Sequence, residues 1–303
     1  MELRVGCEFD YESTWPTPAV MLVEPHHDTP HRIVREGWVT EPSFPSHTYR
    51  DAFGNLCRRF VLPVGAARLR YDAVVEISGA PDDVEPGAVQ VPVEELPDEV
   101  LVFTLPSRYC LSDALMGTAW ELFGGSEPGW ARVQAVCDWI NGNIEYGVKS
   151  TPLTTALDIY ERRGGVCRDF AHLGVTFCRA LNIPARYVFG YMPDIGLPPP
   201  YPPMDFHAWF EVYLGGRWYT FDARFNTPRI GRIPIGRGRD AVDVAMVTTY
   251  GAAQFKRMVV WADEVGHEAG APVGVAVGDD CTGGEQELGA GRTRDADRVA
   301  GDG

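Results

Sequence analysis

Residues 164–173 read GGVCRDFAHL, and they place a cysteine where the chain passes from a pair of glycines into a helical pattern. Small or apolar residues recur at the spacing of a helix with one buried face: Phe170, Gly174, Phe177, Cys178 and Leu181. Asn182 and Pro184 then end the pattern. The spacing therefore predicts a helix with Cys167 in its first turn.

A cysteine in the first turn of a helix lies against backbone N–H groups that lack partners within the helix, at the positive end of the helix dipole. Both features favour the thiolate over the thiol, so this position suits a reactive nucleophile. The alternative is that Cys167 is a small buried apolar residue, as most single cysteines are. The local sequence alone favours that alternative, and a catalytic role requires a base elsewhere in the chain.

Two strand-like runs downstream, at 205–214 and 217–222, are joined by Gly215-Gly216. A two-residue glycine turn between such runs predicts a β-hairpin. Counting back from the turn gives the register: Leu214 with Arg217, Tyr213 with Trp218, Trp209 with Asp222, and His207 with Arg224. His207, Trp209 and Asp222 then share a face, and Asp222 is the diagonal neighbour of His207, at roughly 7–8 Å between backbones.

A carboxylate beside an imidazole can accept from one ring nitrogen and leave the other facing a nucleophile, as in a catalytic triad. Taken singly, His207 would more often be a structural histidine and Asp222 a carboxylate at the end of a strand. The combination of a cysteine at a helix start, a histidine on a strand and an aspartate in register favours a triad of Cys167, His207 and Asp222.

Four segments carry a family resemblance: GGVCRDFAHL at 164–173, LNIPARYVFGY at 181–191, FHAWFEVY at 206–213 and RWYTFDAR at 217–224. Together they resemble the core of the transglutaminase-like superfamily of bacterial proteins, which is related to papain-like cysteine proteases and peptide N-glycanases. The resemblance is strongest over residues 130–260. It departs from the family at Ala223, where many relatives have proline, and this affects the turn after the strand.

The resemblance implies that Cys167 is the nucleophile, His207 the general base and acid, and Asp222 the residue that orients His207. It also implies an α+β fold, in which an N-terminal antiparallel β-sandwich-like domain precedes a papain-like core of helices packed on an antiparallel sheet. The active site of such a core lies where the helix meets the sheet. No cofactor and no metal are expected.

The order of elements along the chain agrees with that fold class. Short runs with turn signals between them predict an N-terminal sandwich or small barrel, with strands at 3–11, 19–23, 33–39, 56–62 and 68–77. Helices are expected at 112–123, 128–144 and 154–163, and two strands near 242–247 and 255–261 are expected to close the sheet of the core. We therefore divide the chain into a β domain at 1–100 with a linker to about 107, a catalytic core at 108–263 and an acidic, disordered tail at 264–303.

Composition limits the classes of partner. A formal net charge of −15 over 303 residues argues against nucleic acid and anionic membranes, which bind basic surfaces. No stretch approaches the roughly 18 apolar residues of a membrane span, and the first residues lack the apolar core of a signal peptide. A cytoplasmic protein that acts on a protein or peptide substrate is expected, and its oligomeric state stays open.

The cysteines and histidines do not form a recognisable metal site. The seven cysteines are scattered, with no C-x-x-C pair, so metal and disulfide frameworks are not expected. Cys137 and Cys178 lie on apolar helix faces and are interpreted as core residues. His26, His27 and His31 with Asp28 could hold a metal, but their spacing fits no common zinc pattern and a solvated loop is preferred.

Three further segments keep two interpretations each. The backbone N–H of Cys167 is one candidate donor to an oxyanion, and either Asn143 or Tyr146 could be a second or a surface residue. The proline-rich segment 193–203 could line the substrate cleft or simply connect two strands. Five arginines follow Asp222, and they could form a solvated loop face or recognise a substrate carboxylate: Arg224, Arg229, Arg232, Arg237 and Arg239.

The sequence thus favours a thiol enzyme that attacks an amide or isopeptide carbonyl through a Cys167 acyl-enzyme, with hydrolysis as a peptidase or amidase preferred. A protein-glutamine transamidase is the alternative, since a triad does not select between water and an amine as acceptor. A binding module that has kept the fold without catalysis is the alternative from another class. A metal-dependent hydrolase would need more ligands than the histidine segment offers.

Overall fold

Alternating polar and apolar residues from Glu2 to Ser13 form strand β1, in the middle of a five-stranded sheet. The structure is a computed structural model that describes residues 1–197, 203–266, 275–276 and 285–287. The order of this sheet is β15-β14-β1-β6-β3, with β3 at Arg32–Glu41, β6 at Gly65–Glu76, β14 at Ala253–Glu264 and β15 at Val275–Ala276.

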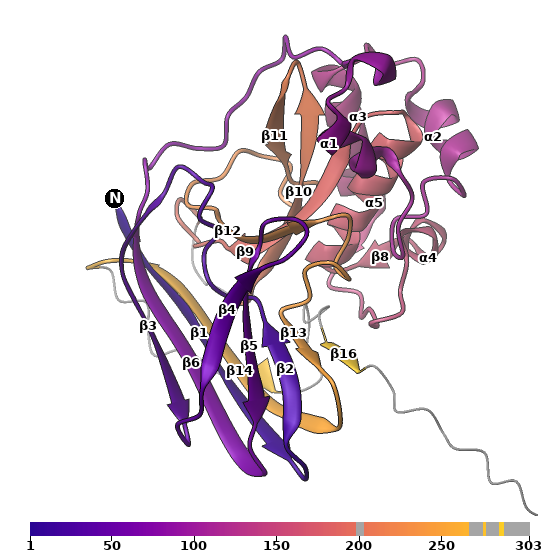
Figure 1. Cartoon of the computed structure of the whole chain (residues 1–303). Coiled ribbons are helices and arrows are strands. Elements are labelled where there is room, and N and C mark those ends of the chain that lie inside the picture. Colours follow the sequence, from indigo (N-terminus) through magenta and orange to yellow (C-terminus); the bar gives the residue numbers. More distant parts are fainter. Residues whose placement is uncertain (198–202, 267–274, 277–284, 288–303) are drawn as a thin grey trace, which may run out of the picture.

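A second five-stranded sheet packs against the first and completes a sandwich (Figure 1). Its order is β16-β13-β2-β5-β4, with β2 at Thr17–Met21, β4 at Ser46–Arg50, β5 at Leu56–Leu62, β13 at Val247–Thr249 and β16 at Glu285–Glu287. Side chains from both sheets, such as Leu3, Val5, Met21 and Phe60, share one buried cluster. The predicted sandwich is confirmed, and β4 is a strand that the sequence pattern did not reveal.

Strands from the far end of the chain complete this sandwich. β14 pairs with β1 from Leu3–Glu264 to Ser13–Ala253, and β13 pairs with β2. The strand expected near 242–247 overlaps β13 only at Val247. The expectation that these strands close the sheet of the catalytic core is therefore wrong. Alternation identifies a strand but not its partner, and the edge that takes a strand depends on the whole fold. The proposed domain boundaries themselves stay predictions.

The predicted tail, 264–303, falls for the most part outside the described residues. Within it, β15 and β16 are short strands that pair with β14 and β13. These two pieces therefore differ from the expected disorder.

The third sheet carries the residues of the predicted site. Its order is β11-β10-β9-β12, with β9 at Ala185–Tyr191, β10 at His207–Leu214, β11 at Arg217–Phe221 and β12 at Ile233–Gly238. The turn between β10 and β11 has φ values of 54° at Gly215 and 94° at Gly216, a conformation that favours glycine at both positions. The predicted hairpin register is confirmed from Leu214–Arg217 to Phe210–Phe221.

Helices gather at one side of this third sheet, with the sandwich at the opposite end of the molecule (Figure 1). They are α2 at Met116–Phe123, α3 at Trp130–Asn143, α4 at Ala156–Arg162 and α5 at Cys167–Ala180. Between them, β7 (Glu145–Tyr146) pairs in parallel with β8 (Gly164–Gly165). In the described part of the chain, no helix has the length and apolar character needed to cross a membrane.

Helix α5 is buried along its whole length. It packs on β10 so closely that a Cβ atom added at Gly174 would lie 2.5 Å from the Phe210 ring. A glycine is needed at this crossing because any side chain would meet a ring that is itself fully buried.

The chain from Pro81 to Thr104, which the predicted boundaries divide between the end of the β domain and its linker, has structure of its own. It forms the short helices η1 (Val93–Glu95), α1 (Asp98–Leu101) and η2 (Val102–Thr104). Leu96 and Val100 pack with Tyr213 of β10, and Pro81 forms an isolated antiparallel bridge with Ile230. This segment therefore braces the hairpin and the chain after it.

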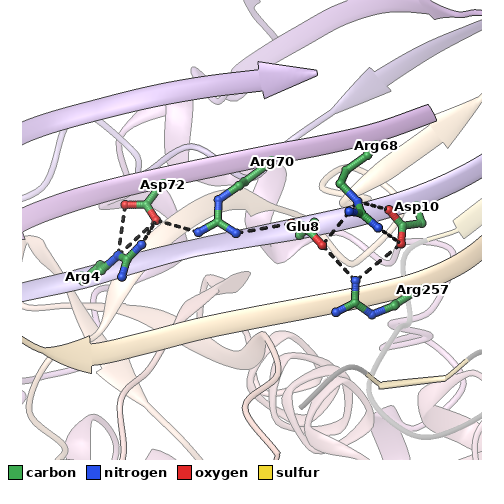
Figure 2. A network of polar contacts seen from close by, with 7 residues as sticks. All are labelled: Arg4, Glu8, Asp10, Arg68, Arg70, Asp72 and Arg257. Atoms are coloured by element: carbon green, nitrogen blue, oxygen red, sulfur yellow. Dashed lines mark hydrogen bonds and ion pairs between the residues drawn. The ribbon is translucent and has the colours of Figure 1, made fainter. Parts of the chain in front are cut away.

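The outer face of β1, β6 and β14 carries a network of ion pairs (Figure 2). Glu8 lies 2.9 Å from Arg257 and 3.3 Å from Arg70, and Asp72 lies 2.7 Å from Arg4. Arg68 pairs with Asp10 at 2.7 Å. The cations and carboxylates on this face thus satisfy one another within the sheet.

Candidate active site

Cys167 is the first residue of α5, as the sequence predicts, and is 2% exposed. The preceding residue, Val166, is extended and caps the helix. Its N–H donates to Oδ2 of Asp169 at 3.0 Å, and Arg168 donates to Oδ1 of the same carboxylate at 2.9 Å. This buried carboxylate fixes the backbone that enters the helix, and with it the position of the cysteine.

His207 and Asp222 are in direct contact, as the hairpin register predicts. Nε2 of His207 lies 2.7 Å from Oδ2 of Asp222, and both side chains are buried. β11 ends at Phe221, and the chain then turns, so that the backbone N–H groups of Arg224 and Phe225 donate to Oδ1 of Asp222 at 3.0 and 3.3 Å. The predicted pairing of His207 with Arg224 across the ladder is absent from the described hairpin because of this turn.

Arg224 instead reaches His207 with its side chain. Its Nη1 lies 3.4 Å from Nδ1 of His207. A guanidinium only donates, so Nδ1 must be the accepting nitrogen and the ring proton lies on Nε2, where it is donated to Asp222. Nδ1 is therefore the basic nitrogen of this histidine, and it takes a proton from a nucleophile only when the Arg224 contact is released.

Arg232 is a second partner of Asp222 that sequence reasoning missed. Its Nη2 donates to Oδ2 at 2.9 Å, and its Nε donates to Asp82 at 2.8 Å. In the sequence, Arg232 is one of several arginines after Asp222, and no local signal shows which of these turns back to the carboxylate. The contact depends on β12 folding beside β9.

Burial and charge act in opposite directions on the His207–Asp222 pair. Burial would raise the pKa of Asp222, but the charges of His207 and Arg232 outweigh it and hold that pKa well below its usual range. Burial lowers the pKa of His207, Asp222 acts against this shift, and Arg232 and Arg224 add to it. At neutral pH the pair therefore consists of a neutral imidazole and a carboxylate.

Two observations relate Cys167 to His207. Gly174 contacts Phe210, Cys167 precedes Gly174 by seven helical residues, and His207 precedes Phe210 by three strand residues. Both spans are about 10 Å. The buried cluster that contains Cys167 also contains Phe206 and Ala208, the neighbours of His207.

The second observation is a continuous path of contacts. Gly165, two residues before Cys167, pairs with Tyr146. The guanidinium of Arg224 lies 3.7 Å from the centre of the Tyr146 ring and also contacts His207. The start of α5 and the start of β10 are therefore linked through Tyr146 and Arg224.

The two candidate oxyanion donors differ in position. The Asn143 amide donates to the Trp139 carbonyl of its own helix at 2.8 Å. Tyr146 lies on β7 beside Gly165, and its ring packs against Phe170 of α5. Tyr146 is therefore the one of the two that lies beside the cysteine helix.

The arginines after Asp222 do not form a solvated face. Arg229 is 5% exposed and the Arg232 side chain is 5% exposed, so the interpretation as a solvated loop is wrong for both. Arg237 pairs with Glu211 at 3.0 Å, and Arg239 pairs with Asp243 at 2.9 Å. The other interpretation, recognition of a carboxylate, stays a prediction.

The remaining predicted positions are spread over the structure. Cys137 and Cys178 are buried core residues, as expected, and burial raises the pKa of the Cys178 thiol to about 12. His26 is buried, so the expectation of a solvated loop is wrong for this residue, and it accepts from the backbone N–H of Asp28 through Nδ1. Part of the proline-rich segment lies outside the described residues, and the described Pro193 accepts from Arg229 through its carbonyl.

Comparisons with known proteins agree with this geometry. Residues 117–223 match the model of the transglutaminase-like superfamily, and this range contains Cys167, His207 and Asp222. An uncharacterized protein of Mycobacterium leprae is 26% identical over 243 residues, which cover 73% of this chain and 81% of the relative. An uncharacterized protein of Mycobacterium tuberculosis is 28% identical over 220 residues, which cover 65% of this chain and 69% of the relative.

Among solved structures, the chain is similar to a "putative cysteine protease" from Cytophaga hutchinsonii. The two chains are 33% identical and superpose with a TM-score of 0.79, over 90% of this chain and 93% of the other. The likeness thus includes the sandwich as well as the helices and the third sheet. The chain belongs to the transglutaminase-like superfamily.

Proposed function

We propose that this protein is a thiol enzyme that cleaves an amide bond through a Cys167 acyl-enzyme, as a peptidase or amidase on a protein or peptide substrate. The observation that supports this most strongly is the buried 2.7 Å contact between His207 and Asp222 at the start of β10. It makes Nδ1 of His207 the basic nitrogen, at the end of the sheet where the cysteine helix begins.

In the proposed reaction, Nδ1 of His207 takes the thiol proton and the sulfur of Cys167 attacks the substrate carbonyl carbon. The tetrahedral intermediate collapses as the C–N bond breaks, and the imidazolium gives its proton to the leaving amine. Water then attacks the thioester, with His207 again as the base, and releases the acid and the thiol. Asp222 keeps the imidazole in its orientation and supports its positive charge.

The backbone N–H of Cys167 is the proposed first donor to the oxyanion, and the Tyr146 hydroxyl is the proposed second. We also propose that the protein acts in the cytoplasm, because a reducing compartment suits a thiol nucleophile, which would otherwise be capped or oxidised. The "cysteine protease" wording for the Cytophaga hutchinsonii structure agrees with hydrolysis as the preferred outcome.

The first test is the pH dependence of Cys167 alkylation by iodoacetamide in the wild type and in His207→Ala, with labelled sites located by mass spectrometry. The shapes of the two profiles are compared rather than the absolute rates, because Cys167 is only 2% exposed. We expect the wild-type profile to rise well below the ordinary thiol pKa of about 8.5, and the variant profile to move up towards it. Identical profiles for the two proteins would leave a binding module as the better explanation.

The acyl acceptor needs a separate measurement. Peptides containing glutamine are incubated with the enzyme in aqueous buffer, with and without methylamine. The masses of the products are then measured by mass spectrometry. Hydrolysis gives new acids in both conditions. Methylamide products that replace the acids would instead favour a transamidase. Neither product should appear with Cys167→Ala.

A further inference from the structure

A cavity of about 320 Å³ lies on the sheet face that carries Trp209 and Glu211. Its walls come from the hairpin of β10 and β11, from residues 77–83 and from the loop around Thr29 and His31. The volume is in the range of sites that bind small organic molecules. Cys167 and His207 are not among its lining residues, so it is a different site from the one where the reaction is proposed.

Each acidic side chain in the cavity wall is already paired with a cation. Glu211 binds both Arg186 and Arg237. Asp82 accepts from Nε of Arg232 and from the backbone N–H of Arg229. Asp83, at the exposed rim, pairs with Arg217 at 3.0 Å. The carboxylates of the wall are therefore unavailable to neutralise a further cation.

Arg229 is the cation in the cavity wall that these carboxylates do not pair with. Its Nη2 donates to the Pro193 carbonyl at 3.2 Å, and its guanidinium lies 4.6 Å from the centre of the Phe225 ring. Within residues 1–197 and 203–266, no carboxylate forms an ion pair with it, and its Nη1 has no hydrogen-bond partner. The charges of Asp194, Asp222 and Asp82 act on Arg229 without a direct ion pair. A buried guanidinium that no carboxylate contacts directly keeps an unused donor, so an anion supplied from outside would be bound favourably.

Arg232 offers a second donor in the same wall. Its Nε and Nη2 are used by Asp82 and Asp222, while its Nη1 lacks a partner among the described residues. The aromatic side chains of Trp209, Trp218 and Tyr219 form an adjacent apolar part of the lining. The free Nη1 atoms of Arg229 and Arg232 are buried and reach an occupant when these side chains turn towards the cavity. Two guanidinium donors beside aromatic rings then match a ligand with one anionic end and an apolar body.

We propose that this cavity binds a small organic carboxylate, with Arg229 as its principal ligand-binding residue and Arg232 as the second donor. The proposal does not depend on the chemistry assigned to Cys167, because it concerns binding alone. Since Arg232 also donates to Asp222, an occupant would act on the His207–Asp222 pair through one side chain. The cavity thus provides a route by which a carboxylate could influence the active site.

The test compares benzoate with its uncharged isostere benzamide by isothermal titration calorimetry on the full chain, in a buffer without phosphate or carboxylate. We expect benzoate to bind at least about tenfold more tightly than benzamide, because it adds a charge-assisted hydrogen bond. Arg229→Gln should remove that difference. The matched control Arg239→Gln loses the same charge at an arginine that pairs with Asp243, outside the cavity, and should bind benzoate as the wild type does.

A second variant keeps the proposal testable if Arg229→Gln does not fold. Ala80 lines the cavity and is exposed, so Ala80→Phe fills the space without removing a buried contact. It should abolish benzoate binding while the circular dichroism spectrum stays unchanged. Equal affinities of the wild type for benzoate and benzamide would overturn the proposal, as would benzoate binding that survives Arg229→Gln or Ala80→Phe.

Discussion

Asp222 receives four hydrogen bonds, two on each carboxylate oxygen. His207 and Arg232 donate to Oδ2, and the backbone N–H groups of Arg224 and Phe225 donate to Oδ1. A carboxylate has about four acceptor positions, so this one is fully used. Its saturation explains why the charge persists in a buried site and why the imidazole has one orientation.

Asp222→Asn tests that account. The amide loses the charge and turns an NH₂ group towards donors, so the orientation and the charge support of His207 are both lost. We expect the catalytic rate to fall by roughly 10²- to 10⁴-fold if the proposed triad operates. The pKa of His207 should fall further, since Asp222 raises it, and the alkylation profile of Cys167 should move to higher pH.

The matched control for that experiment is Asp243→Asn. It removes a carboxylate that binds Arg239 and that makes no hydrogen bond to His207 in the described part of the chain. It should leave the alkylation profile unchanged. A profile for Asp222→Asn that coincides with the wild type would contradict the orienting role.

His172 makes a second prediction at the scale of one residue. It is fully buried on α5, stacks on Tyr109 and accepts from the Ala241 N–H, and burial lowers its pKa to about 3. The unfolded chain has a histidine pKa of about 6.5 and so binds a proton first as the pH falls. Its contribution to stability is therefore complete above pH 6.5 and is lost as the pH falls from there towards 3.

His172→Gln should reduce this acid sensitivity. Urea unfolding at pH 7 and pH 4.5 would measure the free energy of unfolding of both proteins. We expect the variant to be less stable at pH 7, but to lose less stability between the two pH values, by on the order of a few kcal/mol. The variant still loses some stability at low pH, because the pKa values of His26 and His31 are also lowered, to about 4. An equal loss in both proteins would refute the assignment.

Helix α5 and strand β10 form the element pair on which the site is built. The helix presents Cys167 at its first position, and the strand presents His207 at its first position. The position of the helix along the strand is set by close packing of Gly174 against Phe210. An error of one residue in that crossing would displace the cysteine from the histidine by more than an ångström.

Gly174→Ala should therefore disturb both stability and the site. The added methyl group would meet a fully buried ring at 2.5 Å, and we expect a loss of about 1–3 kcal/mol in the free energy of unfolding. Chemical denaturation measures this loss. The same profile of Cys167 alkylation would show whether the level of the helix has changed.

Gly142→Ala is the matched control, since Gly142 also lies in a helix but has nothing within 4 Å of an added Cβ. It should change stability by no more than about 1 kcal/mol, in the stabilising direction, because alanine favours the helix. Equal effects of the two substitutions would mean that the α5–β10 crossing tolerates a side chain.

The whole molecule is held together by pairing between its two ends. β1 is paired along its length with β6 on one side and β14 on the other. Along the sequence, the third sheet and its helices therefore lie between the early and the late strands of the sandwich. The two parts share a buried cluster that includes Tyr191 and Phe206. The sandwich and the candidate site are therefore joined through this one buried cluster, which also contains Cys167.

A fragment of residues 1–107 should fail to fold alone, although the sequence pattern predicts that it is a β domain with its linker. Without β13 and β14, β1 and β2 become sheet edges with unpaired backbone N–H and C=O groups. We expect no cooperative melting transition by circular dichroism, whereas the full chain should melt cooperatively. A cooperative transition of the fragment would show that the late strands are an addition to a complete domain.

The sequence contained much of the candidate site because its parts are local. Helix periodicity located the start of α5, and Gly215-Gly216 fixed the hairpin register and with it the contact between His207 and Asp222. The contacts of Arg232 and Arg224 were not foreseen. Both depend on how the chain turns after β11, and an arginine side chain is long enough to reach many partners from one backbone position.

Periodicity, turn chemistry and charge by themselves determined the α+β class, most strands of the sandwich, the cysteine helix and the histidine hairpin, because each depends on interactions between residues close in the chain. Only the tertiary structure decided that β13 and β14 join the sandwich and that residues 80–83 bridge to the chain after β11. It also decided that Arg229 is buried without a carboxylate partner among the described residues. These features join segments far apart in the chain, and a local pattern identifies a strand or a charge without specifying its distant partner.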